Sequence, residues 1–340
     1  MHSIKKILKT AGLFLLLTAL LSTGLAALYF RGECFLYQDA REREALSGSV
    51  TTLGCGSSNM YFGFRPDVMD AALGGRSYNL SGLLVSMGGR LELLRLELAR
   101  NPVRTVLLEV SAETLVRDRA EEGPEGDLQL LGRLEGKERL SFFLHNFPLS
   151  EYPAVYYDVV SKGIDNALRL LEGSYQTRNE FLRDGYYPNA QKDVYISTWV
   201  LDNYHTATLS TAIRPENVEA LKQIAALCRE QGAELILINT PKTEFYDARY
   251  DNLDYFRAWY TGFAAAEHID YYDFNLYRQK HKLLDDQQHF GDETHLSDSG
   301  AAIFTGFLAE ILSARAEGRN LEPLFYLDYE ARDWGVGYLY

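Results

Sequence analysis

The chain has 340 residues, which suits one large domain or two smaller ones, and its 46% apolar and 13% aromatic content supports a substantial buried core. Its formal net charge of −13 argues against nucleic acid as a partner, because nucleic acid attracts basic surfaces. Three cysteines are too few for a disulfide framework, so no structural disulfide is expected, although Cys34 and Cys55 would be able to pair in an oxidising compartment.

The first predicted element is an apolar helix at the N-terminus. The lysine-rich segment "MHSIKKILKT", residues 1–10, precedes residues 11–30, which carry no charge. Twenty helical residues span about 30 Å, the thickness of a bilayer core. Lysines on the N-terminal side predict a cytoplasmic tail followed by a transmembrane anchor, with the rest of the chain extracytoplasmic. A cleaved signal peptide is the alternative, because "GLAA" at residues 24–27 offers small residues near a cleavage site.

Five short apolar segments follow a linker over residues 31–47, and each predicts a strand. Several are nearly continuous apolar runs, which is typical of strands buried on both faces of a parallel sheet. The five segments are residues 49–55, 76–81, 104–111, 233–240 and 269–275.

Amphipathic segments between these runs predict helices, for example "RPENVEALKQIAALCREQG", which closes on Gly232 as a C-terminal cap. Strands that alternate with such helices predict a three-layer α/β/α sandwich around a doubly wound parallel sheet of about five strands. We expect this domain to cover residues 48–313 and a C-terminal tail to cover residues 314–340. The tail is rich in aromatic residues and is expected to pack back on the domain.

Residues 112–214 interrupt the alternation as a long insertion between the third and fourth predicted strands. The insertion is too long for an idle loop, so a helical cap over one edge of the sheet is expected. The stretch "RDGYYP", residues 183–188, lies at its centre. Its aromatic side chains either bind substrate or, more simply, pack the insertion against the sheet.

The segment "TTLGCGSSNMYFGF", residues 51–64, joins the end of the first predicted strand to a turn of small polar residues. Ligands of doubly wound sheets bind at the carboxyl ends of the strands. Ser58 lies there near a helix N-terminus, whose free N–H groups can stabilise an oxyanion. Ser57 is the nucleophile if the register shifts by one, and Cys55 is a weaker alternative. Taken alone, Ser58 also fits a simple turn or N-cap.

A serine nucleophile needs an oriented base, and "QQHFGDETHLSDSGA" offers one. Asp292 and His295 are three residues apart in a loop after the last predicted strand, so the carboxylate can hold Nδ1–H while Nε2 faces Ser58. The three residues form a candidate triad. By themselves Asp292 and His295 also fit a capped helix start. Together with Glu293 they lack the second histidine pair of a structural zinc site, so no metal is expected.

"LGCGSSNMYFGFRPDVM", "YNLS", "ELILINTP" and "FGDETHLSDSGAAIF", in this order, resemble the SGNH/GDSL hydrolase superfamily. The chain is most similar to its membrane-anchored, extracytoplasmic bacterial branch, which includes relatives of the teichoic-acid D-alanyl transfer and alginate O-acetylation proteins. The resemblance covers roughly residues 48–313. It implies that Ser58 is the nucleophile and that the Asp-x-x-His block is Asp292 and His295.

The sequence departs from the family pattern around the oxyanion hole. Asn59 follows the serine where close relatives often carry His or Glu. The family's glycine block maps most simply onto Gly82, with Gly88 and Gly89 as an alternative. No asparagine stands near residues 109–114, where the third block is expected. Asn239, at the end of the fourth predicted strand, is a further pocket candidate.

The resemblance implies a serine esterase or O-acyltransferase that acts on an O-acylated, most simply O-acetylated, cell-surface glycan or polymer through an acyl-serine intermediate. It requires no cofactor, and such proteins often work beside a membrane-bound acyltransferase. Two alternatives remain. One is a non-catalytic SGNH-fold scaffold of a surface-polymer modification complex, and the other is a lipase or thioesterase with a wide apolar groove.

Overall fold

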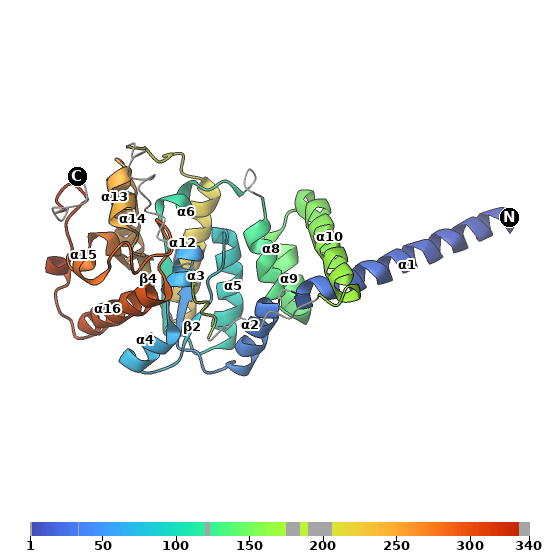
Figure 1. Ribbon diagram of the computed structural model, residues 1–340, viewed down its shortest axis with the longest axis horizontal. Helices are drawn as coiled ribbons and strands as arrows, with labels where there is room; N and C mark the ends of the chain where they lie inside the picture. Colours follow the sequence, from blue (N-terminus) through green and yellow to red (C-terminus); the bar gives the residue numbers. More distant parts are fainter. Residues whose placement is uncertain (1, 33, 120–122, 175–183, 190–205, 333–340) are drawn as a thin grey trace. The chain divides into compact units, whose positions relative to one another are not determined.

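A computed structural model describes residues 2–32, 34–119, 123–174, 184–189 and 206–332 (Figure 1). The chain divides into two compact units. The α/β unit contains the described residues of 42–127 and of 181–340, and the helical unit contains those of 1–41 and 128–180. Each unit is described by itself.

The α/β unit is built on a five-stranded sheet in which every neighbouring pair of strands is parallel. The strand order is β2-β1-β3-β4-β5. The chain therefore reverses its direction of travel across the sheet at β1 and β3, which makes their carboxyl ends the switch point where doubly wound sheets bind ligands. The strands are β1 Thr52–Cys55, β2 Ser77–Asn79, β3 Thr105–Glu109, β4 Glu234–Asn239 and β5 Asp270–Asp273.

Helices cover both faces of this sheet. On one side α16 contacts α3 and α4, and on the other α5 contacts α12. The longer helices are α4 Pro66–Leu73, α5 Met87–Arg100, α12 Pro215–Gln231, α14 Leu253–Glu267 and α16 Asp298–Ala316. The shorter ones are α3 Ser58–Gly63, α6 Ala112–Val116, α13 Glu244–Arg249, η2 Phe274–Leu276, α15 Lys280–Leu283 and η3 Glu322–Leu324.

The strands supply both cores because successive side chains point to opposite faces. Leu107 of β3 and Ile236 and Ile238 of β4 join one buried cluster with Phe304 of α16. Their neighbours Val106 and Leu237 are fully buried toward the other face. This double burial explains why the predicted strands have no polar face, and all five predicted strands are confirmed.

Local signals also set several helix ends. Pro215 occupies the first turn of α12, and Gly232 closes that helix in the left-handed conformation (φ 70°), as the sequence predicts. Residues 31–47, expected as a linker, differ from that expectation. They include the end of α1 and the helix α2, Cys34–Ala45.

The insertion is divided between the two units. The described residues of 112–127 and of 181–214 belong to the α/β unit, whereas residues 128–174 belong to the helical unit. In the described part of "RDGYYP", Tyr186 joins the core cluster around α16 and donates a hydrogen bond to Asp298 Oδ1 (2.7 Å). The backbone N–H of Asn79 in β2 donates to the carbonyl of Asp184 (2.8 Å). This stretch therefore packs along the β2 edge of the sheet.

The helical unit contains α1 His2–Gly32, the part of α2 up to Arg41, and the helices of residues 128–174. Residues Ile4–Phe30 of α1 are long and apolar enough to cross a membrane, a property that signal sequences share. The remaining helices are α8 Glu125–Gly132, which begins in the α/β unit, α9 Gly136–Asn146, η1 Leu149–Glu151 and α10 Tyr152–Leu171.

Helix α16 docks closely on the loop that precedes it. A Cβ at Gly300 would lie 1.9 Å from the carbonyl oxygen of His289, whereas a Cβ at Gly306 of the same helix would meet nothing within 4 Å. Gly300 is therefore required because the backbone of His289 passes close to it, whereas Gly306 has room for a side chain.

We predict that Gly300→Ala lowers the free energy of unfolding by about 1–3 kcal/mol because the loop must move away. The matched variant Gly306→Ala should raise it by about 0.5–1 kcal/mol through the better helix propensity of alanine. Urea unfolding of the full chain in detergent measures both. Equal effects of the two substitutions would contradict the close-docking argument.

Candidate active site

Ser58 follows a tight turn after β1, and this turn leaves no room for a side chain at Gly56. β1 ends at Cys55, and α3 begins at Ser58. A Cβ at Gly56 would lie 2.5 Å from Glu109 Cβ at the end of β3 and 2.7 Å from Met60 Cβ. Because β1 and β3 pair in parallel, with Cys55 opposite Leu108, the turn passes directly over the end of β3. Glycine is required there by close approach.

Ser57 caps α3, and Ser58 presents its hydroxyl. The Ser57 side chain accepts a hydrogen bond from Asn59 N (3.3 Å), which is the usual N-cap arrangement. The Ser58 hydroxyl lies 2.7 Å from His295 Nε2. Cys55 is 1% exposed, so its thiol is inside the core. Of the three candidates, only Ser58 contacts the histidine.

His295 and Asp292 come from the loop between α15 and α16. His295 Nδ1 lies 2.6 Å from Asp292 Oδ2. Since an ionised carboxylate can only accept, Nδ1 carries the proton and Nε2 is left to accept the hydrogen bond that Ser58 Oγ–H donates. The other oxygen, Asp292 Oδ1, accepts the backbone N–H groups of Thr294 and His295, each at 2.8 Å. The carboxylate thus fixes both the loop and the tautomer.

The surroundings keep Asp292 ionised. Burial opposes ionisation, but the hydrogen bond and charge of His295 and the N–H groups of Thr294 and His295 more than offset it, so the pKa of Asp292 falls to about 2. The Phe62 ring stands edge to face against the imidazole, with 5.4 Å between ring centroids. The imidazole is therefore oriented from two sides.

Beneath Ser58 lies a buried ion pair that the sequence analysis missed. Glu109, fully buried, accepts the backbone N–H of Ser57 at Oε2 (2.8 Å), and Arg90 Nη1 lies 3.5 Å from the same oxygen. Arg90 also donates to the Glu109 carbonyl (2.7 Å) and is 2% exposed. The available signal was a glutamate closing the apolar run "TVLLE". The pair holds the Ser58 turn against β3.

A cavity of about 350 Å³ opens in front of Ser58. This volume is within the range of small-molecule sites. The lining combines polar side chains with apolar ones; the polar ones include Ser58, Asn59, Arg90, Ser111, Thr114 and His295, and the apolar ones are Leu84, Val85, Met87 and Val116. A larger hollow of about 770 Å³ runs along β5 and the C-terminal segment, but it contains none of the three triad candidates. The candidate site is therefore identified by the three triad candidates and not by the volume of the cavity.

The predicted oxyanion glycine needs correction. The Gly82 N–H donates to the Gly56 carbonyl (3.3 Å), so it is already used, and Gly82 does not line the cavity. The alternative Gly89 N–H donates to Ser86 Oγ (3.0 Å) as part of the α5 cap, and Gly88 lies within α5 beside it. By contrast, no described residue accepts the Ser58 N–H, which opens α3 and faces no preceding turn.

Asn59 is the polar side chain in the cavity that most clearly lacks a partner. It is 9% exposed and lines the cavity, and its Oδ1 is buried without a hydrogen bond among the described residues. Since amide oxygen and nitrogen are assigned from their partners, either end can face the cavity. A buried amide left unpaired costs about 1–3 kcal/mol, which a bound substrate would recover.

Asn239 does not belong to this cavity. Its Nδ2 donates to Asp273 Oδ1 (3.2 Å), and its Oδ1 accepts from Lys242 Nζ (3.0 Å). It lines a small separate hollow at the end of β4. Asn239 does lie at the end of the fourth strand, as predicted, but β4 is not at the switch point between β1 and β3. Within the described residues, no group of three or more His, Cys, Asp or Glu side chains is arranged to hold a metal.

Helix α13 supports the loop that carries Asp292. Its N-cap Thr243 donates through its hydroxyl (2.9 Å) and its backbone N–H (3.1 Å) to the Glu293 carbonyl. On the other side, Asp286 accepts the N–H groups of Glu244 (3.0 Å) and Phe245 (3.3 Å). The start of α13 is thus held between two points of the loop region.

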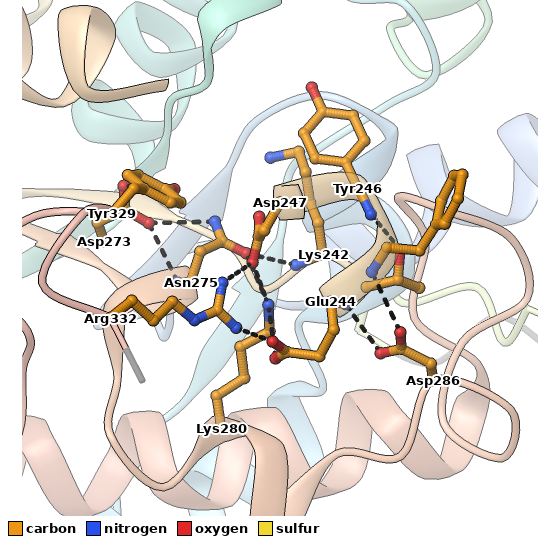
Figure 2. Close-up of polar contacts among 12 residues, drawn as sticks. Lys242, Glu244, Tyr246, Asp247, Asp273, Asn275, Lys280, Asp286, Tyr329 and Arg332 are labelled. Atoms are coloured by element: carbon orange, nitrogen blue, oxygen red, sulfur yellow. Dashed lines mark hydrogen bonds and ion pairs between the residues drawn. The ribbon is translucent and has the colours of Figure 1, made fainter. Parts of the chain in front are cut away.

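A buried ionic cluster anchors α13 from below (Figure 2). Lys280 Nζ lies 2.5 Å from Asp247 and 3.4 Å from Glu244, and Arg332 of the C-terminal segment pairs with both carboxylates. Burial opposes ionisation of Glu244, but Lys280 and Arg332 hold its pKa below the ordinary value. Burial raises the pKa of Asp247. The described part of the tail, which ends at Arg332, therefore packs on the α/β unit, as expected.

We predict that Lys280→Met lowers the free energy of unfolding by about 3–5 kcal/mol, because it leaves two buried carboxylates with Arg332 as their one remaining cation in the cluster. Lys280 is 1% exposed, whereas Lys282 in the same short helix is exposed. The control Lys282→Met should change the free energy of unfolding by less than about 0.5 kcal/mol. Urea unfolding in detergent compares them, and similar losses in both variants would count against the cluster.

Asp286 predicts a pH dependence of stability. Burial raises its pKa to about 6. Because folding favours the protonated form, this contribution is fully present below the ordinary pKa near 3.9 and is lost as pH rises through about 6. The free energy of unfolding of the wild type minus that of Asp286→Asn should therefore fall by about 1–3 kcal/mol between pH 4 and pH 7. Urea titrations at several pH values test it, and a flat or rising difference contradicts it.

Comparison with protein families finds no family that matches this chain, and comparison with curated proteins finds no match. The functional argument therefore rests on the geometry of Ser58, His295 and Asp292 and on the cavity in front of them.

Proposed function

We propose that this protein is a serine esterase or O-acyltransferase of the SGNH type that forms an acyl-serine intermediate on Ser58. The observation that carries the proposal is the relay of two short contacts, Ser58 Oγ to His295 Nε2 (2.7 Å) and His295 Nδ1 to Asp292 Oδ2 (2.6 Å). A nucleophile, a base and an orienting carboxylate in this order are the arrangement that acyl transfer requires.

In the first half-reaction, Ser58 Oγ attacks the ester carbonyl carbon while His295 Nε2 takes the hydroxyl proton. The negative charge on the carbonyl oxygen is stabilised by the Ser58 N–H and by the Asn59 side-chain amide, whose unpaired position in the cavity supports this role. His295 then gives its proton to the leaving alkoxide, the ester C–O bond breaks, and the acyl group remains on Ser58.

In the second half-reaction, His295 removes a proton from water or from a sugar hydroxyl, and that oxygen attacks the acyl carbon. Collapse of the intermediate breaks the bond to Ser58 Oγ, which recovers its proton from His295. Water gives hydrolysis, and a sugar hydroxyl gives transfer. Asp292 stays ionised throughout, which its pKa of about 2 supports.

For the substrate we propose an O-acylated, most simply O-acetylated, cell-surface glycan or polymer. The polar side chains of the lining suit a hydroxyl-rich ligand, and the cavity volume of about 350 Å³ suits a short acyl group better than a long acyl chain, which argues against a lipase. No cofactor is needed for these steps. A membrane-bound acyltransferase is the partner that we propose as the acyl source for the transfer reaction.

We further propose that α1 is an uncleaved anchor with a cytoplasmic N-terminus, and that the α/β unit is extracytoplasmic. The end of α1 belongs to the packed interior of the helical unit, which supports its retention. Tyr29 is 3% exposed, and a Cβ at Gly163 of α10 would lie 2.4 Å from the Leu25 carbonyl oxygen. Cleavage near residues 24–27 would remove this partner from α10.

A non-catalytic scaffold on the same fold is the second candidate. One observation favours it, since the Gly82 N–H that the family would use is occupied by the Gly56 carbonyl. The short Ser58–His295 contact counts against it.

We predict that a fluorophosphonate probe labels the full-length protein in detergent, because such probes react with activated serines. Ser58→Ala should abolish labelling, and His295→Ala should slow it by about 10³-fold or more. The adjacent control Ser57→Ala should keep labelling, since it loses only an N-cap worth about 1 kcal/mol. Absence of labelling in the wild type would support the scaffold, and labelling of Ser58→Ala would refute the assignment.

A further inference from the structure

Helix α10 carries a stripe of exposed apolar side chains. Tyr157, Ile164, Leu168 and Leu171 are 74%, 45%, 51% and 84% exposed. At 3.6 residues per turn these four positions lie within about 60° of one another around the helix. The charged residues of α10 form a separate stripe, made of Asp158, Lys162, Asp165 and Arg169.

A different face of α10 packs against the end of α1. Tyr156 contacts Ser22 through their hydroxyls (2.6 Å), Gly163 meets the Leu25 carbonyl, and Asn166 donates to the Leu28 carbonyl (3.3 Å). All these partners lie within the segment Ile4–Phe30 that is able to cross a membrane.

The contact places α10 at a definite height along α1. Residues 4–21 of α1 are exposed throughout, and contacts begin at Ser22. The lysines of residues 1–10 precede the uncharged segment 11–30, so the contacts with α10 fall in the second half of that segment. In the proposed topology, α10 therefore packs beside the half of α1 that lies toward the outer face of the bilayer.

The charges of α10 agree with this position. Within the helical unit, α10 is a separate helix that packs against the end of α1 (Figure 1). Its charged stripe excludes a second membrane span. An apolar stripe beside a charged stripe, with tyrosines near one end, is typical of helices that lie in the lipid interface.

We propose that α10 is an interfacial helix whose stripe Tyr157, Ile164, Leu168 and Leu171 is buried in the lipid surface beside α1. The occupant of the stripe is thus lipid and not a second protein. This inference rests on the proposed membrane anchor and is independent of the proposed chemistry at Ser58. It gives the helical unit the function of fixing its own orientation at the bilayer.

Single fluorophores on cysteine test the proposal in full-length protein reconstituted into phosphatidylcholine vesicles. Cys34→Ser provides the background, because Cys55 and Cys228 are buried free thiols. Labels at Leu168→Cys on the stripe and Arg169→Cys on the charged stripe form a matched pair. A label at Leu15→Cys reports on insertion of α1. Each is exposed to nitroxide-labelled lipid and, separately, to aqueous iodide.

We expect the Leu168→Cys label to lose most of its emission to nitroxide lipid and to resist iodide, and the Arg169→Cys label to behave in the opposite way. Three results overturn the proposal. If Leu15→Cys is quenched by lipid but Leu168→Cys only by iodide, the anchor stands and the stripe is in water. If Leu168→Cys is shielded from both quenchers, protein covers it. If Leu15→Cys escapes lipid quenching, the anchor itself fails.

Discussion

The hydrogen bond between Ser58 and His295 joins positions 237 residues apart, and most of the α/β unit is needed to make it. It requires the turn after β1 and the loop before α16 to meet at one edge of the sheet. A parallel sheet meets this requirement because all of its carboxyl ends lie at the same edge. The strand order then decides which loops meet, since β1 and β3 are neighbours at the switch point whereas β4 lies one strand away.

Buried charge supports this edge in two places. Glu109 and Arg90 hold the turn that carries Ser58, and Lys280 and Arg332 compensate the carboxylates under α13, which in turn holds the Asp292 loop. Buried pairs are weak contributors to net stability, but they are costly to break singly. They therefore favour one arrangement over its alternatives, and a triad with contacts near 2.7 Å needs such a defined arrangement.

The helical unit is held together by the packing of α1 and not by buried charge at a sheet edge. Its interior is completed by the end of α1, so the membrane-length helix is at once an anchor candidate and a packing partner. The closest approach between α10 and α1 is at Gly163, where any side chain would meet the Leu25 carbonyl.

Periodicity and spacing in the sequence were sufficient for the five strands, the Gly232 cap, the apolar N-terminal helix and the pairing of Asp292 with His295, because these are local patterns. Local patterns did not reveal that the Gly82 N–H is hydrogen-bonded, that Asn239 lines another hollow, or that Glu109 and Arg90 lie under the turn that carries Ser58. Those facts depend on which strands are neighbours and on how closely backbones approach one another. Such distances between segments far apart in the chain arise only when the whole sheet and its helices pack together.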